Sequence, residues 1–317
     1  MYYQIMHTTR LRYSQPVSES MMEVRMQPRT ESHQRCLRFK LATNPSSRVL
    51  NYADHLGNIV HYFDVPARHA QLFIQAESLV EMNPASDLPD ALSPDSWDIL
   101  DAHVDSHDYY DYIAPSQNTA PSPALAALAS ELNVVRRDDP LSLLREITSR
   151  IYESFAYDSD ITDVDSPIDV ALASRKGVCQ DFSQIMIALV RSLRIPARYV
   201  SGYLFYERMT DRSTPDESHA WVEAMLPGLG WVGFDPTNNI HAGERHIRVA
   251  IGRDYLDVPP NKGLFKGTAE SSLSVDVKIS REEVEQRIED LLPVTSWTLD
   301  PITPEDDDES QQAQHQQ

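Results

Sequence analysis

The sequence predicts an α+β protein in which a small all-β domain precedes a core of helices and antiparallel strands. Residues 1–82 contain several short runs of alternating apolar and polar side chains separated by turn residues, which is typical of a β-sandwich. Two segments between residues 140 and 193 instead repeat their apolar side chains with helical spacing. Residues 198–237 return to alternation and include a tight turn, which indicates strands following helices.

The 317 residues divide into four stretches of different composition. Their number and a hydrophobic content of 41% suit two packed domains. We expect a β-sandwich domain over residues 1–82, an Asp/Pro-rich connector over 83–123, a helix-and-strand domain over 124–300 and a disordered acidic, Gln-rich tail over 301–317. The tail has too few apolar side chains to bury a core.

In the first domain, one alternating run extends from Tyr3 to Tyr13, and others cover residues 37–41, 59–63 and 72–76. The domain's histidines lack the paired spacing of metal ligands, which favours structural or surface roles (His7, His33, His55, His61 and His69). No motif here carries chemistry, so we expect the domain to shape one wall of a cleft or to dock a partner.

The connector has many aspartates but no Asp-x-Asp-x-Asp-Gly calcium loop, and we expect it to be solvated, with a short helix near residues 97–104. An apolar stripe over residues 140–155 then predicts a helix that packs in the core (Leu141, Leu144, Ile147, Ile151 and Phe155).

Cys179 opens the most strongly periodic segment of the chain. The apolar side chains after it repeat at helical spacing (Phe182, Ile185, Met186, Leu189, Val190 and Leu193), and Ile195-Pro196 ends the helix. We expect Gly177 to permit the tight turn into this helix. Free backbone amides and the dipole at a helix N-terminus favour negative charge, so this position suits a thiolate nucleophile and half of an oxyanion hole.

A predicted hairpin carries the partners that such a thiolate needs. Residues 219–225 and 231–237 alternate as strands around the turn at residues 227–230, after an earlier strand over 198–204. With period two, His219 and Asp235 lie on one face of this hairpin. We therefore expect His219 to act as the base and Asp235 to orient it.

Each of these residues alone has an ordinary structural explanation. A cysteine near a helix start is commonly a small buried hydrophobe, a histidine on a strand is commonly structural, and an Asp-Pro after a strand is commonly a turn. Cys179, His219 and Asp235 together favour a catalytic role, because they occur in this order and lie on a helix start and on two paired strands. The other cysteine, Cys36, has no base in its motif and no helix terminus, and we expect the nearby arginines to lower its pKa slightly.

Four motifs resemble the core of the bacterial transglutaminase-like superfamily over roughly residues 140–255. They are Gly177-Val178-Cys179-Gln180-Asp181-Phe182, Ile195-Pro196-Ala197-Arg198-Tyr199-Val200-Ser201-Gly202-Tyr203, Ser218-His219-Ala220-Trp221 and Phe234-Asp235-Pro236-Thr237. Residues 1–82 also resemble the β-rich domain that precedes this core in one bacterial branch.

The resemblance implies a papain-like α+β fold, in which a helix bears the cysteine and an antiparallel sheet bears the histidine and the aspartate. It implies acyl transfer from an amide through a thioester, and members include transglutaminases, peptidases and amidases. No acidic calcium loop like that of animal transglutaminases occurs, so we expect no metal-dependent crosslinker. The second oxyanion donor stays open, with Tyr157 as a candidate.

Composition narrows the partners. A net charge of −20 argues against binding nucleic acid through its phosphates. Two cysteines without a CxxC pair exclude a disulfide framework and do not support zinc ligation. Residues 1–20 lack an apolar stretch of signal-peptide length and no segment is long enough to span a bilayer, so we expect a cytoplasmic protein without a membrane partner. We expect no cofactor and no metal, and the oligomeric state stays open.

These patterns together predict a transglutaminase-like cysteine enzyme that cleaves an amide in a peptide or protein substrate, by hydrolysis rather than amine transfer. Protein-glutamine transamidation is the alternative reaction. Arylamine N-acetyltransferases share the Cys, His, Asp order, but the surrounding motifs match the transglutaminase branch better, and turnover of acetyl-CoA would separate the two. A peptide- or protein-binding module without catalysis is the remaining alternative.

Overall fold

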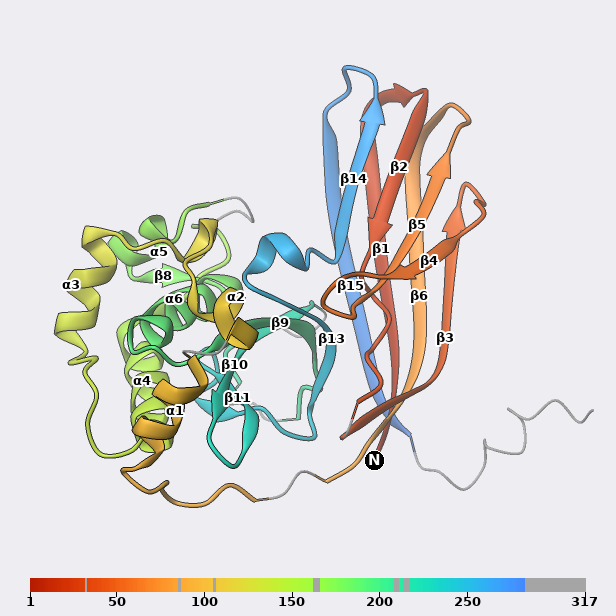
Figure 1. Ribbon diagram of the computed structural model, residues 1–317. Helices are drawn as coiled ribbons and strands as arrows, with labels where there is room; N and C mark the ends of the chain where they lie inside the picture. Colours follow the sequence, from red (N-terminus) through yellow and green to blue (C-terminus); the bar gives the residue numbers. More distant parts are fainter. Residues whose placement is uncertain are drawn as a thin grey trace, which may run out of the picture. The chain divides into compact units, whose positions relative to one another are not determined.

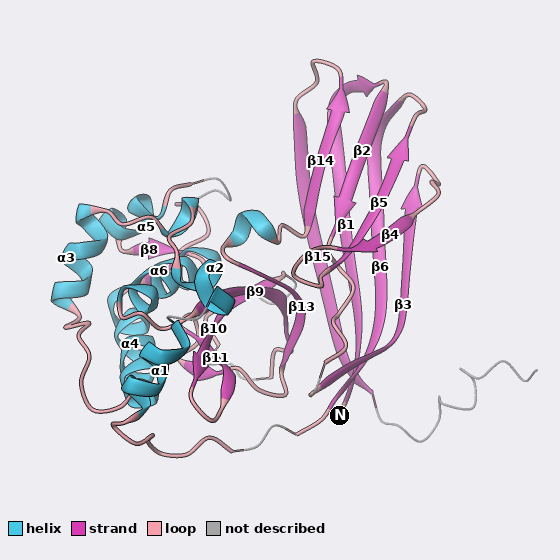
Figure 2. Ribbon diagram, in the orientation of Figure 1, coloured by secondary structure: helices cyan, strands magenta, loops and turns pink. Residues whose placement is uncertain are grey.

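The β-rich part of the chain consists of two four-stranded antiparallel sheets (Figures 1 and 2). The computed structural model describes residues 1–282 except 32, 85–86, 105–106, 162–165, 208–210 and 214–216. One sheet has the order β15 (Ser271–Glu282), β1 (Tyr2–Val17), β6 (His69–Met82) and β3 (Gln34–Asn44). The other has the order β14 (Asn261–Lys266), β2 (Glu19–Val24), β5 (Ile59–Val65) and β4 (Leu50–Ala53). Apolar side chains of both sheets form one fully buried cluster (Val17, Val24, Phe63, Leu72 and Ile74), which confirms the expected sandwich.

The last two described strands differ from the expected domain division, in which residues 124–300 form one domain. β15 pairs with β1 from Tyr2 opposite Glu282 to Tyr13 opposite Ser271, and β14 pairs with β2. Residues 261–282 thus return to the sandwich and complete both of its sheets. Alternation shows that a segment is a strand, but the partner of that strand depends on which sheet edge has unpaired backbone groups.

The rest of the described chain forms a layer of helices on a third antiparallel sheet, which has five strands. The sheet has the order β12 (Ile240–His241), β11 (Gly230–Asp235), β10 (His219–Leu226), β9 (Ala197–Leu204) and β13 (His246–Gly252). Its helices are α3 (Pro123–Glu131), α4 (Pro140–Ser154), α5 (Ile168–Ser174) and α6 (Cys179–Ser192), with a 3-10 turn at Tyr255–Asp257. α6 contacts β9 and β10, and every residue from Gln180 to Arg191 is buried.

The connector also contributes to the core. It contains α1 (Ser96–Val104), α2 (Tyr110–Ile113) and 3-10 turns at His107–Tyr109 and Gln117–Thr119. Leu100 in α1 is fully buried, and Arg191 in α6 donates to the carbonyl of Ala114. Although we expected a solvated segment, the described part of the connector therefore packs against the helical layer. The connector is acidic overall, but a few apolar side chains within it are enough to pack it against the helical layer.

Two buried amide side chains attach the sandwich to the edge of the core sheet. Gln34 donates to the carbonyl of Arg248 and accepts from its amide, both at 2.8 Å. Asn58 does the same with Ile251, at 2.9 and 2.8 Å. Both amides are 0% exposed and bond to the backbone of β13. Residues 1–282 accordingly form one compact unit.

The expected tail over residues 301–317 lies outside the described residues. Among the residues that are described, no helix is both long enough and apolar enough to cross a bilayer.

Candidate active site

Cys179 is the first residue of α6 and is partly buried. The amide of Val178 just before it donates to the carboxylate of Asp181 at 2.9 Å, which closes the start of the helix. A side chain at Gly177 would bring its Cβ within 2.6 Å of the same carboxylate. Gly177 is thus needed for this close approach, and the left-handed backbone conformation in this segment is that of Arg175, at φ 55°.

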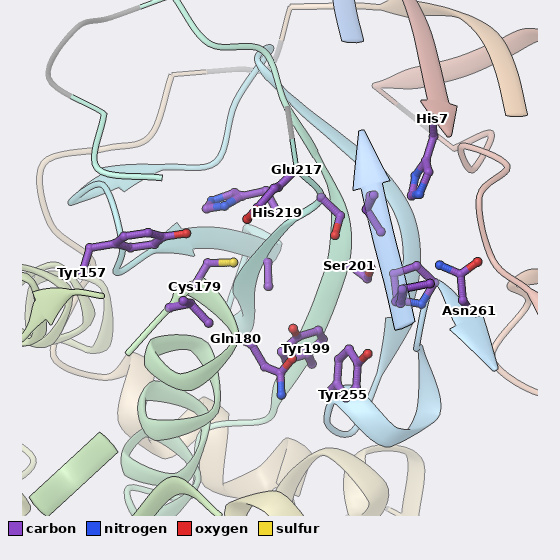
Figure 3. Close-up of a pocket in the computed structure, with 16 residues that line it drawn as sticks. His7, Tyr157, Cys179, Gln180, Tyr199, Ser201, Glu217, His219, Tyr255 and Asn261 are labelled. Atoms are coloured by element: carbon purple, nitrogen blue, oxygen red, sulfur yellow. The ribbon is translucent and has the colours of Figure 1, made fainter. Parts of the chain in front are cut away.

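A short parallel pair brings Tyr157 to the same place. β7 (Ala156–Tyr157) pairs with β8 (Lys176–Gly177), with Tyr157 opposite Gly177. Figure 3 shows the Tyr157 hydroxyl turned toward Cys179 and His219. The tyrosine that we proposed as an oxyanion donor therefore lines the same cleft as the cysteine.

His219 and Asp235 meet through the expected hairpin. His219 begins β10 and Asp235 ends β11, with Glu223 opposite Gly233 in the register between them. Nε2 of His219 lies 2.8 Å from Oδ2 of Asp235, and the two residues are 4% and 0% exposed. The sequence-based expectation that these side chains share a face and come together is thus met by the geometry.

Asp235 accepts five hydrogen bonds. Its Oδ1 accepts from the backbone amides of Thr237 at 3.0 Å and Asn238 at 3.2 Å. Its Oδ2 accepts from His219, from the Asn238 side chain at 2.8 Å and from Nε2 of His246 at 3.2 Å. Burial opposes its charge, but the charge on His219 and the hydrogen bonds from both histidines hold the pKa of Asp235 far below its usual range.

His246 is the site residue that sequence reasoning missed. It begins β13 and is 2% exposed, and its ring meets Trp221 edge-on at 5.1 Å. Its Nδ1 accepts from the amide of Gly243 at 3.2 Å, so Nε2 carries the proton donated to Asp235. Burial lowers the pKa of His246, which keeps the ring neutral. No local motif in the sequence indicates that this histidine reaches Asp235.

His219 faces Cys179 through its remaining ring nitrogen. Nε2 is hydrogen-bonded to Asp235, whereas the buried Nδ1 has no hydrogen-bond partner among the described residues. Burial by itself lowers the pKa of His219, but the hydrogen-bonded Asp235 carboxylate and, to a smaller extent, the nearby Cys179 raise it to about 10. His219 is thus a buried imidazolium held between a carboxylate and a thiol. An imidazolium beside a cysteine at a helix N-terminus stabilises the thiolate.

His219, Asp235 and His246 also bring their donor atoms close enough together to be weighed as metal ligands. Their geometry is instead that of a hydrogen-bonded cluster, because both Nε2 atoms point at the same carboxylate oxygen. The tautomer of His246 places a proton on the nitrogen that a metal would need. These residues therefore suit proton chemistry better than metal binding.

Cys179 and His219 open on a cleft of about 210 Å³ (Figure 3). Core residues line one side of it, including Tyr157, Tyr199 and Ser201. The other side comes from the sandwich and its returning strands, through His7, Asn261, Leu273 and Val275. The β-rich part of the chain thus forms one wall of the cleft, as expected from its lack of chemical motifs.

Comparison with known proteins agrees with this arrangement. Residues 3–81 match the bacterial transglutaminase-like N-terminal region, and residues 127–236 match the transglutaminase-like superfamily. An uncharacterized Mycobacterium leprae protein is 31% identical over 279 residues, covering 87% of this chain and 98% of that protein. A Pseudomonas aeruginosa protein-glutamine gamma-glutamyltransferase is 32% identical over 158 residues, covering 46% of this chain and 24% of that protein.

Among solved structures, a candidate cysteine protease from Cytophaga hutchinsonii superposes with a TM-score of 0.69 at 20% sequence identity. The match covers 90% of this chain and 92% of that one. This likeness in fold confirms the expected α+β architecture with its N-terminal β domain.

Proposed function

Because the chain belongs to the transglutaminase-like superfamily, we propose that it is a cysteine enzyme that attacks amide carbonyls through Cys179. The observation that carries this proposal is the buried row Asp235, His219, Cys179, which ends at the cleft. In this row Cys179 is the nucleophile, His219 exchanges the proton and Asp235 holds the imidazole.

The first half of the reaction forms a thioester. The Cys179 thiolate bonds to the carbonyl carbon, and the π electrons move to the oxygen. When the tetrahedral adduct collapses, the C–N bond breaks, and His219 gives its proton to the leaving nitrogen. In the second half, His219 takes a proton from water or an amine, which attacks the thioester and expels the thiolate.

We propose two donors for the transient oxyanion. The backbone amides of the first turn of α6, which begins at Cys179, have no acceptor within the helix. The Tyr157 hydroxyl, on the same side of the cleft as Cys179, is turned toward the cysteine (Figure 3). A donor of this kind typically contributes about 10²–10³ in rate.

His246 acts as a positioning residue in this proposal. Its Nε2–H bonds to the same carboxylate oxygen as His219 does. His246 therefore helps to fix the position of the Asp235 carboxylate and to keep that carboxylate ionised, without contacting the substrate. Because the His246 ring is neutral, it donates this hydrogen bond without adding a second positive charge beside the carboxylate that pairs with His219.

We propose hydrolysis of a peptide or isopeptide bond as the reaction, because water is always present to accept the acyl group. Transfer to an amine is the second candidate, supported by the partial match to the Pseudomonas aeruginosa protein-glutamine gamma-glutamyltransferase. The two reactions share the thioester and differ only in the acceptor.

A library of peptide amides, incubated with and without a fluorescent primary amine, separates these reactions. Mass spectrometry of quenched protein should find the acyl group on Cys179, and Cys179→Ala protein should carry none. Free acid as the product with the amine present indicates hydrolysis, whereas labelled product indicates transfer. Peptide retained without any acyl adduct or product would favour the binding-module alternative.

A further inference from the structure

β15 is an edge strand of the sandwich and borders the catalytic cleft (Figure 1). It pairs with β1 on one side, and on its other side it forms no ladder with any described strand. Leu273 and Val275 of β15 line the cleft together with Cys179. Leu273 is 55% exposed, and Ser272 and Ser274 beside it are also exposed. One boundary of the cleft is therefore the free edge of a sheet.

The hydrogen-bond pattern of β15 shows which of its backbone groups face away from β1. In an antiparallel ladder, opposed pairs alternate between pairs that exchange hydrogen bonds and pairs that do not. The amide of Ser14 donates to the carbonyl of Glu270 at 2.9 Å, so the bonded pairs contain the even-numbered residues of β15. Leu273 and Val275 lie in the pairs between these. The N–H and C=O groups of Leu273 and Val275 therefore face the free edge.

The opposite side of β1 agrees with this assignment. The amide of Met82 in β6 donates to the carbonyl of Met1 at 2.8 Å, so the odd-numbered residues of β1 bond to β6. The even-numbered residues of β1 are left for β15, and the register places them opposite the even-numbered residues of β15.

The other sheet edges in the described part of the chain are protected against pairing with further strands. Charges, bulges, short length and covering groups are the usual means of such protection. β3 has a bulge and three basic residues, and β14 has two lysines. β4, β7, β8 and β12 have only two to four residues. β13 is covered by Gln34 and Asn58, which bond to its backbone.

The part of β15 beside the cleft lacks this protection. The strand pairs with β1 over twelve consecutive residues without a register shift. Residues 271–275, Ser-Ser-Leu-Ser-Val, contain neither a charge nor a proline. The charged side chains of β15 begin only at Asp276. The one long edge without protection is thus open where it meets the catalytic cleft.

A peptide segment in extended conformation matches this edge. Its main chain presents donors and acceptors at the two-residue spacing of Leu273 and Val275, and addition of a strand to a sheet edge is a recurring mode of peptide recognition. A strand added here would lie beside the cleft that Cys179 lines. Helices and internal strands of a folded protein have already bonded their backbone groups and cannot pair in this way.

We propose that the free edge of β15 binds the substrate as an added β-strand, through the N–H and C=O groups of Leu273 and Val275. The substrate class is therefore extended peptide segments of proteins, rather than folded regions or small amides. The proposal rests on the proposed function of Cys179 and names the substrate class for that site.

Backbone methylation of a probe peptide tests the pairing in full-length Cys179→Ala protein. The probe is fluorescently labelled Ser-Val-Thr-Gln-Val-Thr-Ser-amide, and two further versions carry N-methyl groups on one or the other set of alternate residues. One edge of an added strand faces β15 and the other faces solvent. By fluorescence polarisation, one methylated version should bind at least about tenfold more weakly than the unmethylated probe, and the other should bind like it. Equal binding of the two methylated versions overturns the pairing.

Hydrogen exchange measured by NMR detects the same pairing on the protein. In free Cys179→Ala protein the amides of Leu273 and Val275 should exchange fast, because they have no acceptor among the described residues. Saturating probe should slow their exchange at least about tenfold and leave Ser272 and Ser274 unchanged, since these already bond to β1. Protection of Leu273 and Val275 that needs no probe and rises with protein concentration would show that a second copy of the chain occupies the edge, and would overturn the proposal.

Two substitutions at Leu273 separate its main chain from its side chain. Leu273→Pro removes an outward N–H without removing a bond to β1, whereas Leu273→Ala shortens the side chain and keeps that N–H. Leu273→Pro should weaken binding of the probe about tenfold more than Leu273→Ala does. Thermal melting should show that both variants are folded. Equal effects of the two would assign binding to the side chain and contradict the pairing.

The outcomes also separate this proposal from the proposed function. Protection of Leu273 and Val275 by the probe, with no acyl adduct on Cys179 of wild-type protein from any peptide that binds, supports the edge and contradicts the proposed function. An acyl adduct on Cys179 that forms equally from both methylated versions supports the function and overturns the edge.

Discussion

The two cysteines occupy surroundings that differ in every respect except exposure. Both are partly buried. Cys36 lies on β3, an edge strand of the sandwich, and its Sγ–H donates to the carbonyl of Arg38 at 3.5 Å. Burial raises the pKa of Cys36 to about 11, and the backbone hydrogen bond offsets only part of this. The expectation that nearby arginines lower the pKa of Cys36 slightly is wrong, because burial of the thiol raises it.

Cys179 combines three features that Cys36 lacks. It starts a buried helix, it lines a cleft, and it faces an imidazolium held by a buried carboxylate. The comparison teaches that accessibility alone does not make a thiol a nucleophile. The charged groups near the thiol differ between the two sites, and those near Cys179 come from β10 and β11 rather than from the segment around the cysteine.

Replacement of each cysteine gives the largest expected contrast. Cys179→Ala should lower kcat/KM by about 10⁵-fold or more, because the bond to the acyl group can no longer form. Cys36→Ala should leave kcat/KM unchanged. Turnover of a peptide amide that the wild-type protein cleaves measures both. Activity that survives in Cys179→Ala protein would remove this residue from the reaction.

Asp235→Asn should come next, with a loss of about 10⁴-fold, because an amide no longer stabilises the imidazolium or fixes its tautomer. The variant should still fold, as the Asn oxygen can accept from Thr237 and Asn238. His219→Ala combined with Cys179→Ala should cost little more than either change alone, since the two act as a unit. Additive losses across these variants would contradict the proposed row.

Alkylation by iodoacetamide tests the comparison without a substrate. At pH 6 Cys36 lies about five pH units below its pKa and should hardly react. Cys179 should react at least about a hundredfold faster, because only the thiolate is nucleophilic. Raising the pH toward 11 deprotonates Cys36 and also removes the proton of His219 near pH 10, so the ratio should fall.

Peptide mapping after timed quenching reads both sites, and urea should abolish their difference. His219→Ala should slow labelling of Cys179 at pH 6. Similar rates at the two cysteines in folded protein at pH 6 would show that Cys179 is not activated.

The smallest effect is expected at His246. His246→Leu removes one hydrogen bond to Asp235 and should lower kcat/KM by up to about a hundredfold through misplacement of the histidine. The acid limb of the pH–rate profile should move to higher pH, because the carboxylate is less stabilised. His246→Gln retains an N–H donor and should restore most of both quantities. Equal losses in the two variants, with an unshifted acid limb, would indicate a packing role only.

Local patterns were enough to predict the elements that carry the site. The stripe after Cys179 predicts α6, and the alternation around residues 227–230 predicts the hairpin that brings His219 to Asp235. Such patterns work because helix and strand periodicities are properties of short segments. The position of Cys179 at a helix N-terminus follows from the same reasoning.

Tertiary structure alone decided the features that depend on contacts between distant segments. The return of β14 and β15 to the sandwich, the fifth hydrogen bond to Asp235 from His246 and the wall formed by His7 and Asn261 have no local signal. The sequence shows that a glycine, Gly177, precedes the cysteine, but only the structure shows that the Asp181 carboxylate leaves no room for a side chain there. The physical reason is that strand pairing and the shape of a cleft depend on hydrogen bonds between segments that are distant in the sequence. A sequence pattern shows which side chains of one segment share a face, but it does not show which segment packs against that face.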